Sequence, residues 1–237
     1  MNSINEAMIF AAGFGKRMLP LTIKTPKPLL KINNKSIISY QIERLLELNF
    51  KQILVNGHYL FNELNKQLKI YSPYVKVIYE EEILETGGGL LNLLKKKKFM
   101  NLESPKLLIN GDIFWQKKKN CPVEMLIKKW DDSMDFLLVL KDKNNVLGYN
   151  GNGDFSLKDE NKRVSRIFKK TKNNFVFTGL QIINPKVIKN KKKKFSLREV
   201  FFESIVKNKI YGLIDDNEWY HISKKDDLEK VNAMFQS

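Results

Sequence analysis

The sequence predicts the α/β class, with a mixed, mainly parallel sheet that has helices on both faces. The first observation is that short apolar runs alternate with segments of helical period through the first half of the chain, as in strand–helix–strand units. The second is that glycines or polar residues follow these runs, at the edge where parallel sheets bind ligands. The third is a change in composition from about residue 144, where asparagine and glycine separate short polar segments. This pattern favours a small antiparallel insertion.

The first half of the chain carries the alternation. The apolar run MIFAA at residues 8–12 predicts a short buried strand that enters a glycine-bearing loop. Ser36 is placed to cap a helix, because apolar residues recur at helical spacing directly after it. The later segments predicted here are strands at 52–57, 75–79 and 106–112 and helices at 61–70 and 90–98.

The second half adds the insertion and returns to the core. An antiparallel pair is expected, with one strand starting at Gly153 and its partner at 163–169. The other predicted segments are helices at 123–130 and 195–207, the latter capped by Ser196, strands at 134–140, 175–183 and 209–213, and a final helix through Phe235. No internal repeat or linker divides the chain, which predicts a single domain over residues 1–237.

Composition narrows the class of protein. Of the 237 residues, 43% are hydrophobic and 29% are charged, as in ordinary globular proteins. No apolar run approaches the roughly 20 residues that cross a bilayer, and the amino terminus carries Glu6 and no basic leader segment. A single cysteine, Cys121, excludes an internal disulfide framework and a cysteine metal cluster. We therefore expect a cytoplasmic protein with no membrane partner.

The formal net charge of +16 favours anionic partners. Much of the excess lies in lysine blocks at 95–98, 117–119 and 191–194, at expected helix ends or in loops, where lysine is solvated or stabilises a helix terminus. We therefore expect no specific nucleic-acid partner, although the basic field would attract nucleotides and sugar phosphates. A nucleic-acid-binding module is the alternative, and it predicts tight oligonucleotide binding with a steep salt dependence.

The loop after the first strand carries the strongest chemical pattern. Its glycines leave backbone N–H groups free to face an anion, Arg17 follows closely, and Lys27 is held between two prolines. This combination suits a triphosphate, and the residues expected to meet it are Ala11, Ala12, Gly13, Gly15 and Lys16. The structural alternative is a strand–helix turn with solvated lysines, which explains the glycines but not the two prolines around Lys27.

A carboxylate ends the fourth predicted strand, in the segment Asn110-Gly111-Asp112. At the carboxyl end of a parallel strand, Asp112 would face the same crevice as Arg17 and Lys27. A hard oxygen ligand there suits Mg²⁺, which prefers carboxylates, water and phosphate oxygens. The alternative is a plain turn, because all three residues favour turns.

Taken in order, the segments G-x-G-x-R at 13–17, P-K-P at 26–28 and N-G-D at 110–112 resemble the signature of nucleoside-diphosphate-sugar pyrophosphorylases, the sugar-phosphate nucleotidylyltransferases. The segment LETGGG at 84–89 is most similar to the N-acetylmuramate-1-phosphate uridylyltransferase and mannose-1-phosphate guanylyltransferase-like branch. The resemblance implies a Rossmann-like nucleotide-diphospho-sugar transferase fold with the small antiparallel insertion on the sugar side. It also implies a nucleotide-binding part over about 1–115 and a sugar-phosphate-binding part over about 116–237.

The resemblance also implies roles for individual residues. Arg17, Lys27 and Asp112 are the implied catalytic residues, and Asp112 is the implied ligand of Mg²⁺. Three glycines before a helix would let a base or ribose lie close to the backbone. The further implied nucleotide contacts are Glu85, Gly87, Gly88 and Asn110, and the implied sugar-phosphate contacts are Gly153, Thr178 and Gly179.

One position departs from the family pattern. The family carries W-x-D-x-G near its end, with the aspartate as second Mg²⁺ ligand, whereas here His221 stands at the aspartate and Ser223 at the glycine. A neutral imidazole suits transition ions better than Mg²⁺. Either Mg²⁺ is held through Asp112, phosphates and water, or the metal preference has changed, or catalysis is lost and binding kept. The intact Arg17, Lys27 and Asp112 favour the first.

The sequence therefore predicts a nucleotidyltransferase that joins an NTP and a sugar 1-phosphate and releases pyrophosphate. UTP with N-acetylmuramate 1-phosphate is the first expectation. GTP with mannose 1-phosphate, UTP or dTTP with glucose 1-phosphate, CTP with a phospho-alcohol, and a heptose phosphate are alternatives. A catalytically impaired, nucleotide-sugar-binding regulatory protein is the alternative of another class, motivated by His221. No pattern predicts the oligomeric state.

Overall fold

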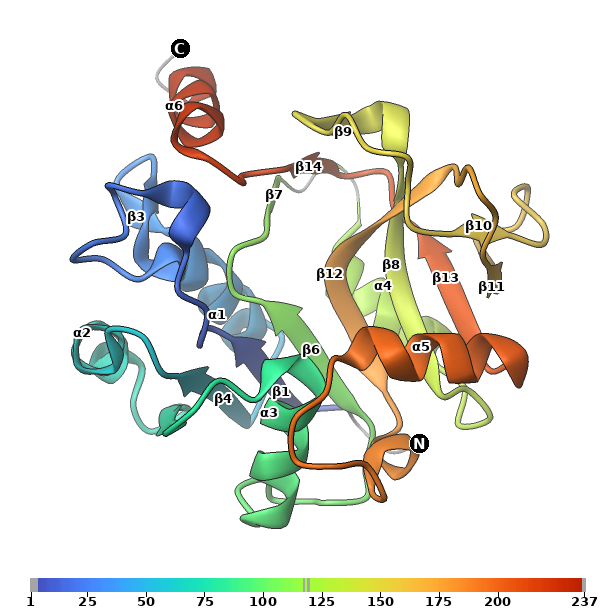
Figure 1. The fold of residues 1–237 in the computed structure, drawn as a ribbon, viewed down its shortest axis with the longest axis horizontal. Helices are drawn as coiled ribbons and strands as arrows, with labels where there is room; N and C mark the ends of the chain where they lie inside the picture. The colour runs from blue at the N-terminus through green and yellow to red at the C-terminus, as the bar shows by residue number, and fades with distance from the viewer. Residues whose placement is uncertain (1–3, 117, 119, 236–237) are drawn as a thin grey trace.

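The computed structural model describes residues 4–116, 118 and 120–235. Its core is a nine-stranded sheet in the order β10-β11-β13-β8-β12-β6-β1-β4-β5 (Figure 1). The strands of this sheet are β5 (Val75–Tyr79), β4 (Gln52–Gly57), β1 (Glu6–Phe10), β6 (Lys106–Asn110), β12 (Phe175–Ile183), β8 (Phe136–Asp142), β13 (Ile210–Ile214), β11 (Val164–Phe168) and β10 (Ser156–Leu157). The α-helices are α1 (Ile37–Glu47), α2 (Phe61–Leu68), α3 (Glu85–Lys95), α4 (Pro122–Lys129), α5 (Leu197–Val206) and α6 (Lys225–Met234).

The sheet is mixed and mainly parallel, as predicted. Strand β1 pairs in parallel with β4 and β6, β4 with β5, and β13 with β8. Strand β12 runs the other way and pairs antiparallel with both β6 and β8. The predicted antiparallel insertion is also confirmed, because β10 and β11 pair antiparallel, with Ser156 opposite Phe168.

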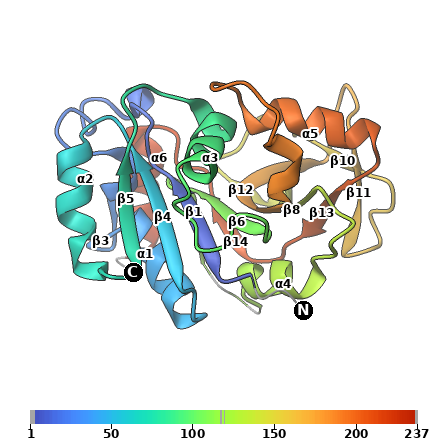
Figure 2. The ribbon, with the colours of Figure 1, turned by 90° about the horizontal axis from the view of Figure 1, so that it is seen from below.

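Helices cover both faces of the sheet (Figure 2). On one face Met8, Leu54 and Leu108 join a buried cluster with side chains of α3 and α5. On the other face Ile9 and Ile53 join a cluster with side chains of α1, α2 and α4. Strands buried on both sides in this way have continuous apolar sequences, which explains why the parallel strands were predicted from short apolar runs.

The predicted helix caps are confirmed. The Ser36 hydroxyl accepts a hydrogen bond from the backbone N–H of Ser39 at the start of α1. Ser196 caps α5 in a reciprocal arrangement with Glu199. The helix predicted over 61–70 ends at Leu68 and continues as a short 3₁₀ turn through Tyr71.

The prediction that the three glycines of TGGG precede a helix is wrong. Helix α3 begins at Glu85 and contains them. The backbone N–H groups of Gly87 and Gly88 both donate to the carbonyl oxygen of Phe195 at 3.0 Å. A Cβ atom at Gly87 would lie 2.2 Å from the Phe195 ring, and one at Gly88 would lie 2.4 Å from the carbonyl oxygen of Lys193. These glycines therefore let the segment before α5 pack directly on α3.

A second, three-stranded sheet carries the carboxy-terminal motif. It consists of β7 (Phe114–Gln116), β14 (Glu218–Tyr220) and β9 (Val146–Leu147) in the order β7-β14-β9. A two-stranded ribbon, β2 (Lys31–Ile32) with β3 (Lys35–Ser36), leads into α1. Because β7 follows β6 closely, the pairing of β7 with β14 brings residues 219–223 to the carboxyl end of β6 (Figure 1).

The lysine blocks lie where helix ends and loops were predicted. Lys95 ends α3, residues 96–98 follow it, and residues 191–194 precede α5 without regular structure. Of the block at 117–119, residues 117 and 119 lie outside the described residues. Among the described residues no helix is both long and apolar enough to cross a membrane.

Candidate active site

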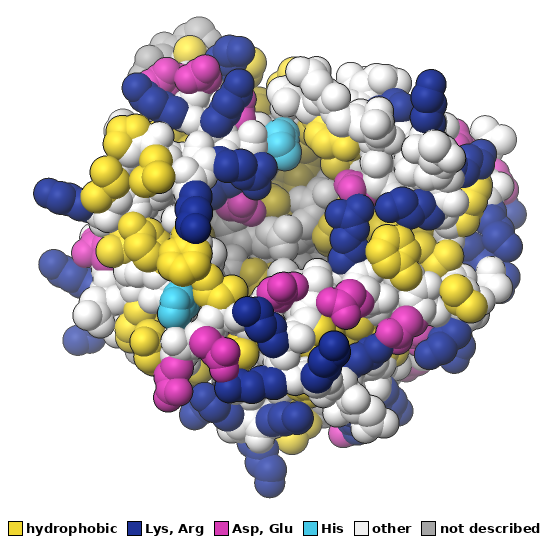
Figure 3. Space-filling view, in the orientation of Figure 1, with side chains coloured by type: hydrophobic (Ala, Val, Ile, Leu, Met, Phe, Trp, Pro, Cys, Tyr) yellow, Lys and Arg dark blue, Asp and Glu magenta, His cyan; other side chains and the backbone are white. Residues whose placement is uncertain are grey.

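The carboxyl ends of β1, β4, β5 and β6 meet at a cavity of about 400 Å³. In Figure 3 a hollow lies near the centre of the face shown, with Lys and Arg side chains around it. The lining residues are Phe10, Ala11, Ala12, Gly13, Gly15, Lys16, Arg17, Met18, Lys27, Pro28, Asn56, Glu80, Ile83, Glu85, Thr86, Asn110, Asp112 and Ser223. A site at the carboxyl edge of the parallel strands is the location predicted for a ligand.

The loop that follows β1 has one position that favours glycine and one where the backbone is uncovered. Gly15 has a φ of +63°, and a Cβ there would lie 2.9 Å from the Thr22 side chain, so the position favours glycine. The Thr22 hydroxyl also donates to the Gly15 carbonyl oxygen at 3.0 Å. A Cβ at Gly13 would meet nothing within 4 Å, and Gly13 is exposed at the cavity wall. The backbone at Gly13 is therefore open to a ligand.

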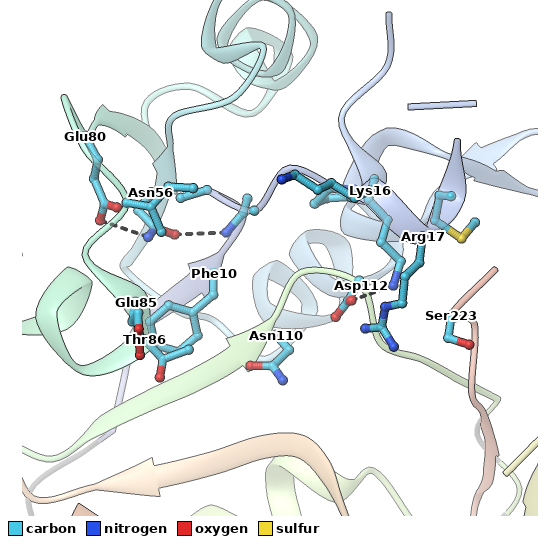
Figure 4. Close-up of a pocket in the computed structure, with 18 residues that line it drawn as sticks. Phe10, Lys16, Arg17, Asn56, Glu80, Glu85, Thr86, Asn110, Asp112 and Ser223 are labelled. Atoms are coloured by element: carbon cyan, nitrogen blue, oxygen red, sulfur yellow. Dashed lines mark hydrogen bonds and ion pairs between the residues drawn. The ribbon is translucent and has the colours of Figure 1, made fainter. Parts of the chain in front are cut away.

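The cations lie on one side of the cavity. Lys16, Arg17 and Asp112 are grouped there, with Ser223 beyond Arg17 (Figure 4). Lys27, whose side chain is 11% exposed, places its Nζ 2.6 Å from Oδ2 of Asp112. Within the described part of the chain Arg17 forms no ion pair, so its charge is available to an anion.

On the opposite side of the cavity, most of the residues labelled in Figure 4 are polar, and none of those labelled there is a cation. Asn56 accepts from the backbone N–H of Ala11 and donates to Oε1 of Glu80, each at 2.9 Å. Glu80 is 2% exposed, its Oε2 has no hydrogen-bond partner among the described residues, and burial raises its pKa. Neither residue was among those predicted from the sequence. Their signal was present, because each lies at or beside the carboxyl end of a predicted strand.

A second cavity of about 190 Å³ adjoins the first, and Arg17, Lys27, Asn110 and Asp112 line both. Its far wall includes Thr178, whose hydroxyl donates to the Val139 carbonyl oxygen at 3.0 Å. His221 also lines this cavity. Its backbone N–H donates to Leu147 and its ring lies edge-on to Tyr149 at 5.8 Å.

The cavity side chains could supply only part of the coordination of a metal ion, so they suit a metal that also binds water or substrate. No group of three or more His, Cys, Asp or Glu residues that could hold a metal ion occurs among the described residues. Asp112 supplies a carboxylate in both cavities. Because Mg²⁺ keeps several waters and is held by one or two carboxylates with substrate phosphates, this donor set fits Mg²⁺. The structure places His221 in the same cavity as Asp112.

The structure brings most of the predicted site residues together. Those that line the first cavity are Ala11, Ala12, Gly13, Gly15, Lys16, Arg17, Lys27, Glu85, Asn110 and Asp112. Thr178 and His221 line the second cavity. Gly87, Gly88, Gly153 and Gly179 line neither cavity. Gly179 has a φ of +90° and lies against Asn110, where a Cβ would be 2.8 Å from its Nδ2.

Comparisons with known proteins agree with this geometry. The nucleotidyl transferase family model matches residues 6–237. The N-acetylmuramate alpha-1-phosphate uridylyltransferase of Caulobacter vibrioides is 28% identical over 91% of this chain and 90% of its own length. The catalytic subunit beta of mannose-1-phosphate guanylyltransferase from Drosophila melanogaster is 26% identical over 94% of this chain, which spans 60% of that protein.

Solved structures share the fold. HddC from Yersinia pseudotuberculosis complexed with GMP-PN has a TM-score of 0.74 at 22% identity, covering 98% of this chain and 99% of that one. A UDP-glucose pyrophosphorylase complexed with UDP-glucose has a TM-score of 0.80 at 15% identity, covering 99% of each chain. With the family model matching almost the whole length, the chain belongs to the nucleotidyl transferase family, among its sugar-phosphate nucleotidyltransferases.

Proposed function

We propose that the chain transfers a uridylyl group from UTP to N-acetylmuramate 1-phosphate. The observation that carries the proposal is the convergence of the open Gly13 backbone, Arg17 and the Lys27–Asp112 pair in one cavity. That cavity adjoins a second one, which is large enough to hold part of another substrate. In this proposal residues up to about 115 hold the nucleotide, and the residues from about 116 hold the sugar phosphate.

The reaction requires two polyanions to meet in line. A phosphate oxygen of the sugar 1-phosphate forms a bond to the α-phosphorus of UTP, and the bond from that phosphorus to the bridging oxygen of the pyrophosphate breaks. The protein positions the two reactants and offsets the negative charge that develops. The negative charge of the leaving pyrophosphate has to be stabilised on the side away from the sugar.

The residues divide this work. The Gly13–Gly15 backbone and Arg17 hold the triphosphate and stabilise the departing pyrophosphate. Lys27 lines both cavities, so its charge reduces repulsion between the two phosphates. Mg²⁺, held by Asp112, would supply Lewis-acid polarisation of the α-phosphate. The 2.6 Å contact between Lys27 and Asp112 keeps both side chains at this junction.

The proposed base and sugar are taken from the related proteins. The uridylyltransferase of Caulobacter vibrioides is matched along most of both chains, and this supports UTP and N-acetylmuramate 1-phosphate. GTP with mannose 1-phosphate is the second candidate. Glu80 favours it, because guanine offers two adjacent N–H donors to a carboxylate, and Glu80 carries an oxygen without a partner among the described residues.

Pyrophosphate release tests the proposal directly. The purified protein is assayed with Mg²⁺, and five NTPs are crossed against a panel of sugar 1-phosphates that includes N-acetylmuramate and mannose 1-phosphates. Turnover with UTP and N-acetylmuramate 1-phosphate is expected. Turnover only with another combination of NTP and sugar 1-phosphate would support the proposed reaction but assign it different substrates. Nucleotide binding without turnover on the whole panel would overturn the proposed catalysis and favour a binding protein.

A further inference from the structure

The carboxy-terminal helix α6 packs behind the loop that follows β1. Its side chains Leu228 and Val231 belong to a buried cluster that also contains Met18. Met18 follows Arg17 in the chain, is fully buried, and is among the residues that line the first cavity. The Arg17 side chain has no hydrogen bond or ion pair within the described residues. The elements packed around Arg17 therefore determine where its guanidinium group lies.

A single carboxylate oxygen fixes the amino-terminal end of α6. Oδ2 of Asp227 accepts from the backbone N–H and the hydroxyl of Ser223, at 2.8 and 3.0 Å, and from the backbone N–H of Lys224 at 3.0 Å. Burial raises the pKa of Asp227, but these hydrogen bonds outweigh burial and hold the pKa below its usual range. The group is therefore ionised at neutral pH, and hydrogen bonds to a charged acceptor are roughly twice as strong as neutral ones.

Ser223 connects this carboxylate to the active site. Ser223 and Arg17 both line the first cavity and the second, and Ser223 lies beyond Arg17 in Figure 4. Because the Ser223 hydroxyl donates its proton to Asp227, its oxygen can only accept from a group in the cavity, and a guanidinium group is purely a donor. Asp227 lines neither cavity, so it acts on them through Ser223.

The carboxy-terminal end of α6 is fixed away from the cavities. The Asn232 side chain accepts from the backbone N–H of Asn33 at 2.9 Å and donates to the carbonyl oxygen of Lys31 at 3.1 Å. Both partners belong to the β2–β3 ribbon, and none of the three residues lines the first or the second cavity. The same helix is thus held at one end beside the site and at the other end outside it.

We propose that Asp227 is a positioning residue for the phosphate site, which holds Ser223 beside Arg17 and so orients the Arg17 guanidinium group toward the phosphates of the nucleotide. The inference rests on the proposed function, because it takes Arg17 to hold the triphosphate and the leaving pyrophosphate. Without the carboxylate, residues 223–224 lose three hydrogen bonds. The unpaired Arg17 side chain then adopts more orientations, and fewer of them reach a phosphate.

A double-mutant cycle tests this role. The probe is inorganic pyrophosphate with Mg²⁺, and its affinity for the full chain is measured by calorimetry in wild type, Asp227→Ala, Arg17→Ala and the double variant. We expect Asp227→Ala to weaken binding about tenfold, which is within the range of coupling between neighbouring residues. In the Arg17→Ala background the same change should weaken binding by less than about twofold, because the group that Asp227 orients is absent.

Two further variants separate positioning from a general loosening of α6. Asn232→Ala removes the hydrogen bonds at the other end of the helix, and it should lower the melting temperature while leaving the pyrophosphate affinity unchanged. Asp227→Asn keeps an acceptor oxygen and should restore most of the affinity that Asp227→Ala loses. If circular dichroism shows that Asp227→Ala is unfolded, Ser223→Ala replaces it in the cycle, with a smaller loss that again depends on Arg17.

The outcomes distinguish this inference from the proposed function. Wild-type affinity in either Asp227→Ala or Arg17→Ala, or an equal effect of Asp227→Ala with and without Arg17, would overturn the positioning role. An equal loss of affinity in Asn232→Ala and Asp227→Ala would do the same. Pyrophosphate release by the wild-type sample reports on the function. Coupling between Asp227 and Arg17 without turnover on any substrate pair would keep the positioning role and reject the transferase.

Discussion

The two sides of the cleft are built by different means. On the amino-terminal side, four parallel strands end at the cavity, and a bare glycine loop and exposed cations follow from their ends. On the carboxy-terminal side, β12 runs antiparallel to both of its neighbours, and Phe177 and Thr178, beside a register shift in this strand, line the second cavity. The first side offers charge and free N–H groups, whereas the second offers side chains that are mostly already hydrogen-bonded.

This difference explains which substrate part each side suits. Phosphates are recognised by any cation or N–H group placed nearby, and strand ends supply those groups together. A sugar is recognised by the positions of its hydroxyl and acyl groups, which requires oriented polar side chains. The two sides are in contact where the backbone N–H of Gly87 donates a hydrogen bond to the carbonyl oxygen of Phe195. Substitutions on each side of the cleft and at this contact test the comparison.

Arg17→Ala should lower turnover by about 10²- to 10³-fold, the usual loss when one donor to a developing anion is removed. Arg17 is exposed and forms no ion pair among the described residues, so the melting temperature should stay unchanged. Pyrophosphate release and a thermal melt measure the two quantities. Lys24→Ala, at an exposed lysine of the same loop region that does not line the first cavity, is the control. Near-normal turnover in Arg17→Ala would remove Arg17 from the mechanism.

Gly87→Ala should destabilise the fold by about 1–3 kcal/mol, the cost of overpacking a filled interior. The added methyl group would meet the Phe195 ring at 2.2 Å. Gly13→Ala is the matched control, since its Cβ would meet nothing within 4 Å, and it should leave stability unchanged. Chemical denaturation measures both variants. Equal stability of the two would show that the segment before α5 moves away easily, and that the contact between the two sides is loose.

Glu80→Gln should stabilise the protein at alkaline pH and have little effect near pH 4. Burial raises the pKa of Glu80 in the folded state, so the folded state binds the proton more tightly than the unfolded state. Wild type is then fully stable below the unfolded pKa of about 4.3 and loses stability as pH rises through the folded pKa. Melting temperatures of both proteins across this range measure the effect. A constant difference between them at all pH values would contradict the raised pKa.

His221→Asp should have the smallest effect, a several-fold decrease in the Mg²⁺ concentration that gives half-maximal turnover. The change adds a carboxylate to the cavity that Asp112 already lines, and hard oxygen ligands favour Mg²⁺. His221 is exposed, so stability should change little. A Mg²⁺ titration of pyrophosphate release measures the effect, with His58→Asp as the control. An unchanged titration would place His221 outside the metal site.

Most of the helices and strands, and the position of the glycine-bearing loop after the first strand, were predictable from the sequence. Apolar runs, helical spacing and the Ser36 and Ser196 caps depend on near neighbours in the chain, so each prediction needed only a short window. The same holds for Gly13, Arg17 and Lys27, which are close in sequence. Because parallel strands share one carboxyl edge, the placement of Asp112 beside them also followed from the predicted fold class.

Contacts between residues far apart in the sequence depend on the tertiary fold. The start of α3 at Glu85 depends on the carbonyl of Phe195, more than a hundred residues away, which accepts the N–H groups of Gly87 and Gly88. The Asn56–Glu80 contact likewise depends on strands brought together by the sheet, and so does the burial of the Gln181 Oε1, which has no hydrogen-bond partner among the described residues. A local pattern carries no record of such contacts, because the free energy of a buried hydrogen bond depends on what the fold places opposite it.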